Sequence, residues 1–397
     1  MDNGLYSIFY LKDEDEFLEC TKPVEAFIYY KEFKIDLLTS EKILTPITEL
    51  CDELATIELG KTFEKPIVFH FFYEFGYLFQ DQLDSISTSE PMAIKIRYLK
   101  HSQSSITMKP DKVTFKLVEY PKLKDYKIKY NKVFDHLLNG DCYQVNLTHP
   151  FFFETKVKLE DKDFLRLFVN SKERLGAYAH YTSIGCMDKA FLSNSPECLF
   201  KAFNTGEKLT IRSMPIKGTI EDKGIGSWGE LKNSLKDQGE LYMITDLIRN
   251  DLSKIKLTPS RVIKRKAPLR VPGIVHQFSV VDTTVEKETT LLNVMEALFP
   301  GGSITGAPKK RVMEIIKEIE KYPRGFYCGS TVLLHKSLKC ASINIRSAEI
   351  SLDKDEIKYG SGGGVTLLSK CESEFKETFQ KMESFIKFLD VEIVSND

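Results

Sequence analysis

The spacing of apolar residues predicts helices in the second half of the chain. Apolar positions recur every three or four residues in three stretches, 228–252, 308–321 and 372–389. Pro308 lies at the start of the second of these, where its missing N–H costs little. A further helix is expected over residues 127–139, ended by Gly140.

Other segments have the alternation or the aromatic content of strands. Residues 70–80 (FHFFYEFGYLF) are too aromatic for a surface loop and suit a buried strand. Residues 94–120 alternate well enough to predict two exposed edge strands. The remaining predicted strands lie at 142–153, 191–219, 326–335 and 340–352. We therefore expect a strand-rich N-terminal subdomain, residues 1–120, interleaved with a mixed α and β domain, residues 121–391.

Composition removes several classes of function. Lys and Arg number 56 and Asp and Glu 57, which gives a net charge of −1 and no basic excess for a nucleic acid. The eight cysteines form no Cys-x-x-Cys pair, so we expect reduced thiols and a cytoplasmic location. The N-terminus lacks the pattern of a signal peptide, and no long apolar window predicts a membrane span.

Acidic residues gather on two of the predicted helices. Glu374, Glu377 and Lys381 share one flank of the last helix, away from its apolar stripe. Two carboxylates one turn apart can share a hard cation, although a solvated face with charge pairs is the ordinary explanation. Residues 240–252 (ELYMITDLIRNDL) also place Glu240 and other charges among core-type residues. A Mg²⁺ ion shared between the two helices would explain both patterns.

Two glycine-rich segments could bind anions. Residues 299–310 (FPGGSITGAPKK) lead into a helix N-terminus, where free backbone N–H groups attract negative charge. This is not a Walker A loop, because Ala307 and Pro308 follow Gly306. Residues 359–365 (YGSGGGV) are either a flexible loop tip or a backbone cradle for an anion.

Four single residues remain ambiguous on local pattern alone. Arg346 lies in a predicted strand and is either a solvated edge residue or a bidentate partner of a carboxylate. Lys217 precedes a Gly-Thr turn and is either a surface lysine or, in a dry site, a nucleophile. Glu197 and His276 stand beside apolar segments, where such residues are more often structural than catalytic.

Taken in order, these segments resemble the chorismate-binding enzymes, which include synthases of anthranilate, aminodeoxychorismate, isochorismate and salicylate. The resemblance runs from about residue 122 to residue 389. Its motifs are 140–147 (GDCYQVNL), 195–197 (SPE), 215–219 (PIKGT), 240–252, 300–309 (PGGSITGAPK), 362–364 (GGG) and 374–377 (EFKE). So many ordered blocks make chance agreement negligible.

Two positions relate the chain to subgroups of this family. Lys217 stands where anthranilate synthases carry Ala and where the first components of aminodeoxychorismate synthases typically carry Lys. Gln144 stands where isochorismate and salicylate synthases carry a water-activating Lys. The chain therefore resembles the aminodeoxychorismate synthase subgroup, with anthranilate synthase component I and a catalytically silent chorismate-binding scaffold as alternatives. Met214 and Pro323 replace arginines that are common in the family, and Val332-Leu333 replaces Gly-Tyr.

The resemblance implies a fold and a reaction. The fold is of the anthranilate synthase component I type, an α+β fold in which two antiparallel sheets face each other with helices packed outside. The reaction is the Mg²⁺-dependent amination of chorismate to 4-amino-4-deoxychorismate, on the route to p-aminobenzoate and folate. Lys217 would form a covalent adduct at C2 of the ring, and Glu197 would protonate the departing C4 hydroxyl.

The resemblance also implies the binding residues and a partner. Glu240 and Glu377 would hold Mg²⁺, with Glu374 close by. The implied substrate-binding residues are Arg346, Tyr327, Thr219, Thr305, Gly306, Gly362, Gly363, Gly364, His276 and Gln144. The chain has no Gly-x-Cys-x-Gly block of a glutamine amidotransferase, so we expect a separate glutaminase subunit to supply the ammonia.

Overall fold

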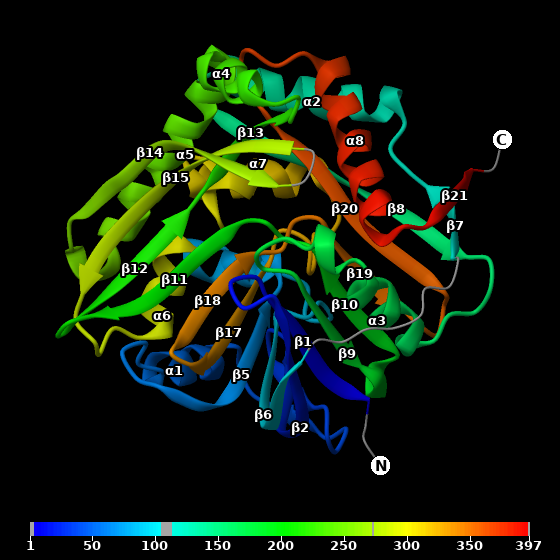
Figure 1. Cartoon of the computed structure of the whole chain (residues 1–397), viewed down its shortest axis with the longest axis vertical. Coiled ribbons are helices and arrows are strands. Elements are labelled where there is room, and N and C mark those ends of the chain that lie inside the picture. Colours follow the sequence, from blue (N-terminus) through cyan, green and yellow to red (C-terminus); the bar gives the residue numbers. More distant parts are fainter. Residues whose placement is uncertain (1–3, 105–112, 272–273, 396–397) are drawn as a thin grey trace.

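The computed structural model describes residues 4–104, 113–271 and 274–395 (Figure 1). Its helices are α1 Thr48–Thr56, α2 Leu123–Leu138, α3 Asp161–Asn170, α4 Ile225–Asn233, α5 Leu235–Ser253, α6 Leu291–Leu298, α7 Lys309–Glu320 and α8 Cys371–Leu389. Its strands up to residue 221 are β1 Leu5–Leu11, β2 Glu16–Tyr29, β3 Phe33–Asp36, β4 Lys42–Leu44, β5 Phe63–Phe71, β6 Ala93–Ser104, β7 Thr114–Glu119, β8 Gln144–Thr155, β9 His180–Ile184, β10 Lys189–Ser193, β11 Cys198–Thr205, β12 Lys208–Met214 and β13 Ile216–Glu221. The remaining strands are β14 Ser260–Val271, β15 Ile274–Val285, β16 Gly306–Ala307, β17 Ser330–Lys336, β18 Leu338–Ile343, β19 Ser347–Ser351, β20 Glu356–Val365 and β21 Glu392–Ser395.

The strands form two antiparallel halves that meet at the long strand β2. One half has the order β7-β8-β20-β19-β10-β9-β1-β2. The other continues from β2 through β6-β5-β17-β18-β11-β12-β15, and both β13 and β14 pair with β15. Strand β21 adds to β7 in parallel. Figure 1 shows the consequence: β5 and β6 from the N-terminal part lie beside β17 and β18 from the C-terminal part.

An apolar core fills the space between the two halves. It contains buried side chains from β1, β2 and β10 of one half and from β5, β6 and β17 of the other, including Phe9, Leu18, Phe191, Val68, Ile96 and Leu333. His70 of β5 stacks on His180 of β9 and on Phe191, with ring centroids 5.8 Å apart in both pairs. The two halves therefore face each other, and the fold class expected from the sequence is confirmed.

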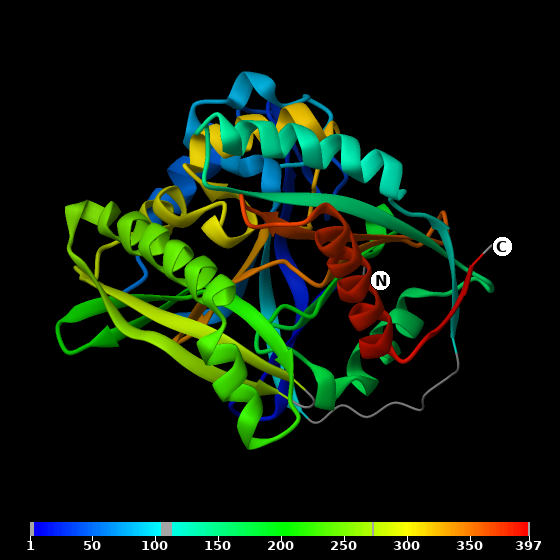
Figure 2. The ribbon, with the colours of Figure 1, turned by 90° about the horizontal axis from the view of Figure 1, so that it is seen from above.

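Helices cover the outer faces, because each has one apolar stripe that must be buried. Helices α1, α5 and α6 pack against the half that contains β5 and β17. Helices α3 and α8 pack against the half that contains β8 and β20, and α2 and α7 cover the end of β8. Figure 2 shows α2, α5 and α8 as separate helices around the sheets. Among the described residues, no helix has the length and apolar character needed to cross a membrane.

The helix predictions are largely confirmed. Helices α7 and α8 match the predicted stretches, and α2 begins four residues earlier than expected, at Leu123. The predicted helix over 228–252 is instead two helices, α4 and α5, separated at Ser234. The Ser234 side chain accepts a hydrogen bond from the backbone N–H of Asp237 and so caps the start of α5.

Three of the strand predictions are wrong in detail. Strand β5 ends at Phe71, and Tyr73–Gln80 forms a buried 3₁₀ helix in which Gly76 lies against Pro300. Strands β6 and β7 exist, but each has a neighbour on both sides and is therefore no edge strand. The predicted strand over 340–352 is broken between β18 and β19, and Arg346 lies in the break with φ of 53°.

The domain boundary near residue 120 stays a prediction. Strands from the two sides of it are paired, as in β1 with β9, β5 with β17, and β7 with β8. This pairing brings the N-terminal strands into the same sheets that carry the candidate site.

Candidate active site

One cavity of about 480 Å³ collects most of the predicted site residues. They come from the loop before β11, from β13, β15 and β20, from the loops around β17 and β19, and from helices α5 and α8. The predicted residues that line it are Glu197, Lys217, Glu240, His276, Tyr327, Arg346, Gly362, Gly364, Glu374 and Glu377. Segments that are far apart in the sequence therefore meet at one cavity. Its volume is in the range that suits a small ligand.

Lys217 and Glu197 face this cavity together. Lys217 lies on β13, and its Nζ donates a hydrogen bond to the backbone oxygen of Ser303 at 3.3 Å. Glu197 is 3% exposed, and its backbone oxygen accepts a hydrogen bond from the N–H of Ile343 at 3.0 Å, which holds the loop before β11.

The environment of Glu197 favours its protonated form. Burial raises the pKa of the Glu197 carboxyl, and the nearby Lys217 charge and Ser303 hydroxyl only partly offset this rise. Its Oε1 atom is buried without a hydrogen-bond partner among the residues that the structure describes. A buried carboxyl group of this kind can donate a proton to a ligand oxygen in the cavity.

Arg346 supplies a cation to the same cavity. Burial lowers the pKa of the Arg346 guanidinium from its usual value, and the neighbouring Tyr359 opposes this effect. Burial, together with the Arg346 charge, lowers the pKa of His276 to about 4, so this imidazole is neutral at neutral pH. Within the described part of the chain, Arg346 forms no ion pair with a carboxylate. The site therefore offers a guanidinium for the carboxylate of a ligand.

The three consecutive glycines 362–364 belong to strand β20, not to a turn or a loop tip. They pair with β8, with Gly362 opposite Thr148 and Gly364 opposite Asn146. A Cβ atom at Gly364 would lie 2.7 Å from the side-chain nitrogen of Gln144, and one at Gly362 would lie 2.3 Å from the backbone oxygen of Leu147. These glycines are therefore required for close packing along the wall of the cavity.

The carboxylates of α8 lie against the same strand. A Cβ atom at Gly363 would be 3.1 Å from Glu374 Oε2 and 3.8 Å from Glu377 Oε1. Glu374 is buried and Glu377 is half-buried, and Lys381 pairs with Glu377 at 2.8 Å while donating to the Gly362 oxygen at 2.6 Å. Lys381 therefore already places one positive charge beside these carboxylates, of which only Glu374 is buried.

The carboxylates of α5 and α8 are the residues that could hold a hard cation with the help of a ligand. Glu240 of α5 lines the same cavity as the two α8 carboxylates. Over the described ranges, no three His, Cys, Asp or Glu residues are grouped closely enough to bind a metal unaided. Mg²⁺ commonly keeps several waters and takes only one or two protein carboxylates, and the substrate completes its coordination.

The other predicted residues shape the site from outside its lining. Thr305 is buried, and its hydroxyl donates to the Gly301 oxygen at 2.9 Å. Gly306 has φ of +142°, and a Cβ atom there would be 1.9 Å from the backbone oxygen of Gln144. Gln144 is fully buried, and neither atom of its amide group has a partner among the described residues. Thr219 lies opposite His276 in the β13–β15 pair, and its side chain is outside the described residues.

The sequence interpretation missed several residues of the cavity lining. They include Asn146, Asp237, Tyr359, Gln380 and Ser384. Gln380 and Ser384 follow Glu377 at helical spacing, so the flank already identified on α8 could have revealed them. Asp237 could not be found in this way, because the break at Ser234 changes which face of α5 is turned inward.

Comparison with known proteins places the chain in a family. The family model described as "chorismate binding enzyme" matches residues 64–387, which is most of the chain. The protein therefore belongs to the chorismate-binding enzyme family. The match begins well before residue 122, where the motif resemblance starts.

Individual relatives agree with this assignment. Aminodeoxychorismate synthase component 1 of Escherichia coli is 34% identical over 274 residues, which cover 67% of this chain and 57% of that protein. The protein of the same name from Salmonella typhimurium is 31% identical over 320 residues, which cover 78% of this chain and 67% of that protein. The chain thus matches little more than half of the length of the Escherichia coli relative.

A solved structure supports the fold independently. Anthranilate synthase component I from Streptococcus pneumoniae superimposes with a TM-score of 0.74 at 20% identity, over 93% of this chain and 92% of that one. At this level of identity, the similarity shows the shared fold and not a shared reaction.

Proposed function

We propose that this protein aminates chorismate at C4 of the ring to give 4-amino-4-deoxychorismate, acting as the synthase component of an aminodeoxychorismate synthase. The observation that carries the proposal is that Lys217 and Glu197 line one cavity with Arg346 and the α8 carboxylates. Sequence similarity to two proteins named aminodeoxychorismate synthase component 1 favours this reaction.

Chorismate is a dianion, so this reaction requires a positive partner in the cavity for each carboxylate. Arg346 would bind the enolpyruvyl carboxylate beside Tyr327, which lies against the backbone of Gly360. Glu240 and Glu377 would hold Mg²⁺, with Glu374 close by. The bound Mg²⁺ would neutralise the ring carboxylate.

The amine of Lys217 would make the first covalent bond. In its neutral form it would attack C2, the two ring double bonds would shift, and the C4–O bond would break. Glu197 would give its proton to the departing hydroxyl, which leaves as water. Ammonia would then form the C4–N bond, the double bonds would shift back, and the C2–N bond to Lys217 would break. Covalent attack divides one difficult substitution into two easier steps.

The burial of Glu197 supports its role as the acid. A carboxyl group with a raised pKa keeps its proton at a pH where an exposed glutamate has lost it. Proton donation of this kind typically contributes about 10²- to 10⁴-fold to a rate.

We also propose a separate glutaminase subunit as the source of ammonia, with ammonium salts as a weaker substitute. The name "component 1" of the Escherichia coli relative implies a second component for that protein. For this chain, a pull-down with a purified glutaminase component and a glutamine-dependent assay would test the association.

Product analysis tests the reaction directly. The protein is incubated with chorismate, ammonium and Mg²⁺, and the products are separated by chromatography and identified by mass. We expect a product that an added aminodeoxychorismate lyase converts to p-aminobenzoate, and we expect a chelator to abolish its formation until Mg²⁺ is restored. Anthranilate and pyruvate would instead indicate an anthranilate synthase. Chorismate binding without turnover would indicate a silent scaffold.

A further inference from the structure

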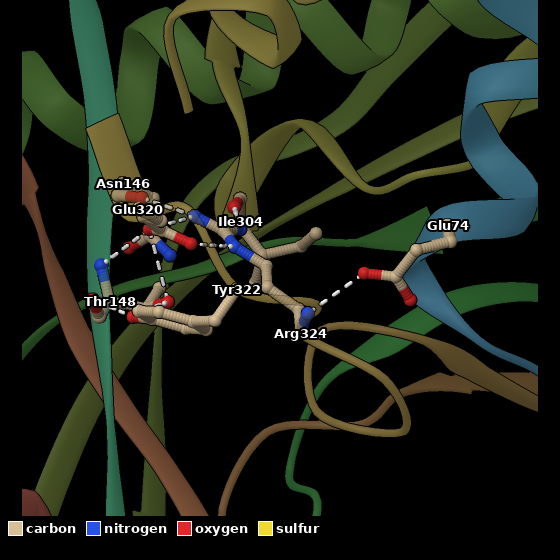
Figure 3. Close-up of polar contacts among 7 residues, drawn as sticks. All are labelled: Glu74, Asn146, Thr148, Ile304, Glu320, Tyr322 and Arg324. Carbon is tan, nitrogen blue, oxygen red and sulfur yellow. Dashed lines mark hydrogen bonds and ion pairs between the residues drawn. The ribbon is translucent and has the colours of Figure 1, made fainter. Parts of the chain in front are cut away.

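A buried ion pair lies directly behind the cavity, at the end of α7 (Figure 3). Arg324 Nη2 and Glu320 Oε1 are 2.8 Å apart, and both side chains are 1% exposed. A second contact joins Arg324 Nε to Glu320 Oε2 at 2.9 Å, so the pair is bidentate. The ring of Tyr73 lies 4.6 Å from the guanidinium carbon. Such complete burial of two charges needs an explanation, because desolvation makes it costly.

The remaining donors of Arg324 bind two backbone oxygens of the cavity wall. Nη1 donates to the oxygen of Ile304 at 2.7 Å, and Nη2 donates to the oxygen of Asn146 at 2.7 Å. Ile304 and Asn146 both line the cavity, whereas Arg324 does not. The guanidinium therefore joins the glycine-rich segment before α7 to strand β8 from behind.

Side chains from residues 320–322, next to Arg324, complete the hydrogen bonding along one edge of β8. Strand β16 pairs with β8 only at residues 144 and 145. Farther along β8, Glu320 Oε1 accepts the backbone N–H of Thr148 at 2.8 Å, and the hydroxyl of Tyr322 donates to the Thr148 backbone oxygen. Side chains thus replace a strand along this edge, because buried backbone groups need partners. The other edge of β8 pairs with the glycines of β20. Holding β8 in place therefore also holds the part of the cavity wall that β20 forms.

Arg324 is connected to Lys217 through two consecutive backbone oxygens, those of Ile304 and Ser303. Ser303, whose backbone oxygen accepts the hydrogen bond from Lys217 Nζ at 3.3 Å, directly precedes Ile304. Holding the Ile304 oxygen therefore limits the movement of the Ser303 carbonyl. Arg324 is itself anchored at its backbone, since its N–H donates to Glu74 Oε1 at 2.8 Å.

We infer that Arg324, held by Glu320, is a positioning residue that fixes the cavity wall and orients the amine of Lys217. An arginine suits this task because its planar fork presents several donors in a rigid geometry, which a lysine lacks. Reactive side chains need such support to stay within a fraction of an ångström of their working position. The kinetic part of this inference rests on the proposed function, and the labelling test below does not.

The test compares Arg324→Lys with Arg311→Lys. Arg311 is a matched control, because it lies on α7 and pairs with Glu314 at 3.0 Å, but both of these side chains are 42% exposed. At a fixed pH, an amine-reactive reagent labels the folded protein, and peptide mass spectrometry measures the rate at Lys217. We expect Arg324→Lys to change this rate at least 5-fold and Arg311→Lys to change it less than 2-fold.

Steady-state kinetics with chorismate supply the second measurement. For Arg324→Lys we expect kcat to fall at least 10-fold and KM to change less than 3-fold, since Arg324 does not line the cavity. If this variant fails to fold, Glu320→Gln, which keeps the shape of the side chain, takes its place with the same expectations.

A lower melting temperature with an unchanged kcat and an unchanged labelling rate at Lys217 would show that the pair is only structural, and would overturn the inference. If the wild-type protein does not turn over chorismate, the proposed function fails. The labelling rates of the variants then still decide whether Arg324 orients Lys217.

Discussion

Two acid–base pairs, Glu320–Arg324 and Glu197–Lys217, lie behind the cavity and in its lining, and they differ in burial and in hydrogen bonding. Both oxygens of Glu320 accept hydrogen bonds, from Arg324 on each oxygen and from Thr148 on Oε1. In contrast, Glu197 Oε1 has no partner among the described residues, although Glu197 is 3% exposed. Lys217 has a hydrogen bond of 3.3 Å to a backbone oxygen.

This difference separates a structural role from a chemical one. A fully bonded buried pair holds its surroundings in one arrangement, and breaking it is expensive. A buried polar group that lacks its partners retains bonding capacity for a ligand, at a cost in stability. The proposed catalytic pair belongs to the second kind, and it lies against a wall that the first kind supports.

The largest expected effect is on activity, from Lys217→Ala. We expect a loss of at least about 10³-fold in the amination rate, because a nucleophile is removed. Stability should change by less than about 1 kcal/mol, because Lys217 is only half-buried and its hydrogen bond is long. The product assay and urea unfolding measure the two quantities. Residual activity above a tenth of wild type would remove Lys217 from the reaction.

Breaking the satisfied pair should give the opposite result, with a large effect on stability. Glu320→Ala leaves the Arg324 charge buried and unpaired, which should cost about 3–5 kcal/mol in urea unfolding. Glu314→Ala is the control, because its ion pair with Arg311 is exposed and worth about 1 kcal/mol or less. Equal losses in the two variants would contradict the structural role of Glu320.

Glu197→Gln tests the proton donor through its pH dependence. The raised pKa of Glu197 means that the carboxyl is protonated above its ordinary range and loses its proton as the pH rises through the raised value. Wild-type kcat/KM should therefore fall on the alkaline side of that pKa. In Glu197→Gln we expect a rate about 10²- to 10³-fold lower and no such fall, because the amide does not titrate. If Glu197→Gln lowers kcat/KM by the same factor at every pH and keeps the alkaline fall, Glu197 is not the proton donor.

Glu74 shares features of both pairs. Its carboxyl group accepts a hydrogen bond from the Arg324 N–H, as a structural group would, but its pKa is raised into a range where it titrates. Burial raises the pKa of its carboxyl to about 7, and hydrogen bonding to the backbone of Arg324 opposes this rise. The folded state therefore binds the proton more tightly than the unfolded state. Stability should fall by at most about 3 kcal/mol as the pH rises from the ordinary glutamate value to about 7. Glu74→Gln should remove this slope, as seen when unfolding curves of both proteins are compared across pH. Parallel curves would contradict the prediction.

Helical periodicity predicted correctly which residues share one flank of the last helix. It placed Glu374, Glu377 and Lys381 on one flank of α8, and these residues lie together at the cavity or beside it. The prediction succeeded because the positions of residues a turn apart depend only on the local backbone.

Arg346 shows where local pattern was insufficient. Alternation predicted an unbroken strand through it, whereas the chain turns there with a positive φ. The turn is held by contacts with a distant segment, since the Arg346 oxygen accepts the N–H of Asn194 at 3.0 Å. The spacing of apolar residues around position 346 carries no information about such a long-range contact.

Arg324 was overlooked for the same reason. In the sequence it stands beside Pro323, a departure from the family pattern, and nothing near it indicates a buried charge. Its role appears only when Ile304, Asn146 and Glu74 are brought around it from three other parts of the chain.

The sequence by itself determined helices α2, α7 and α8, the near-zero net charge and the ordered motifs that mark the family. These follow from local spacing and residue type, which act over a few positions. Only the tertiary structure decided which buried charges are fully bonded and which keep free bonding capacity, because a hydrogen bond depends on the distance between atoms that the fold brings together. The division between Glu320–Arg324 and Glu197–Lys217 is therefore a property of the folded chain.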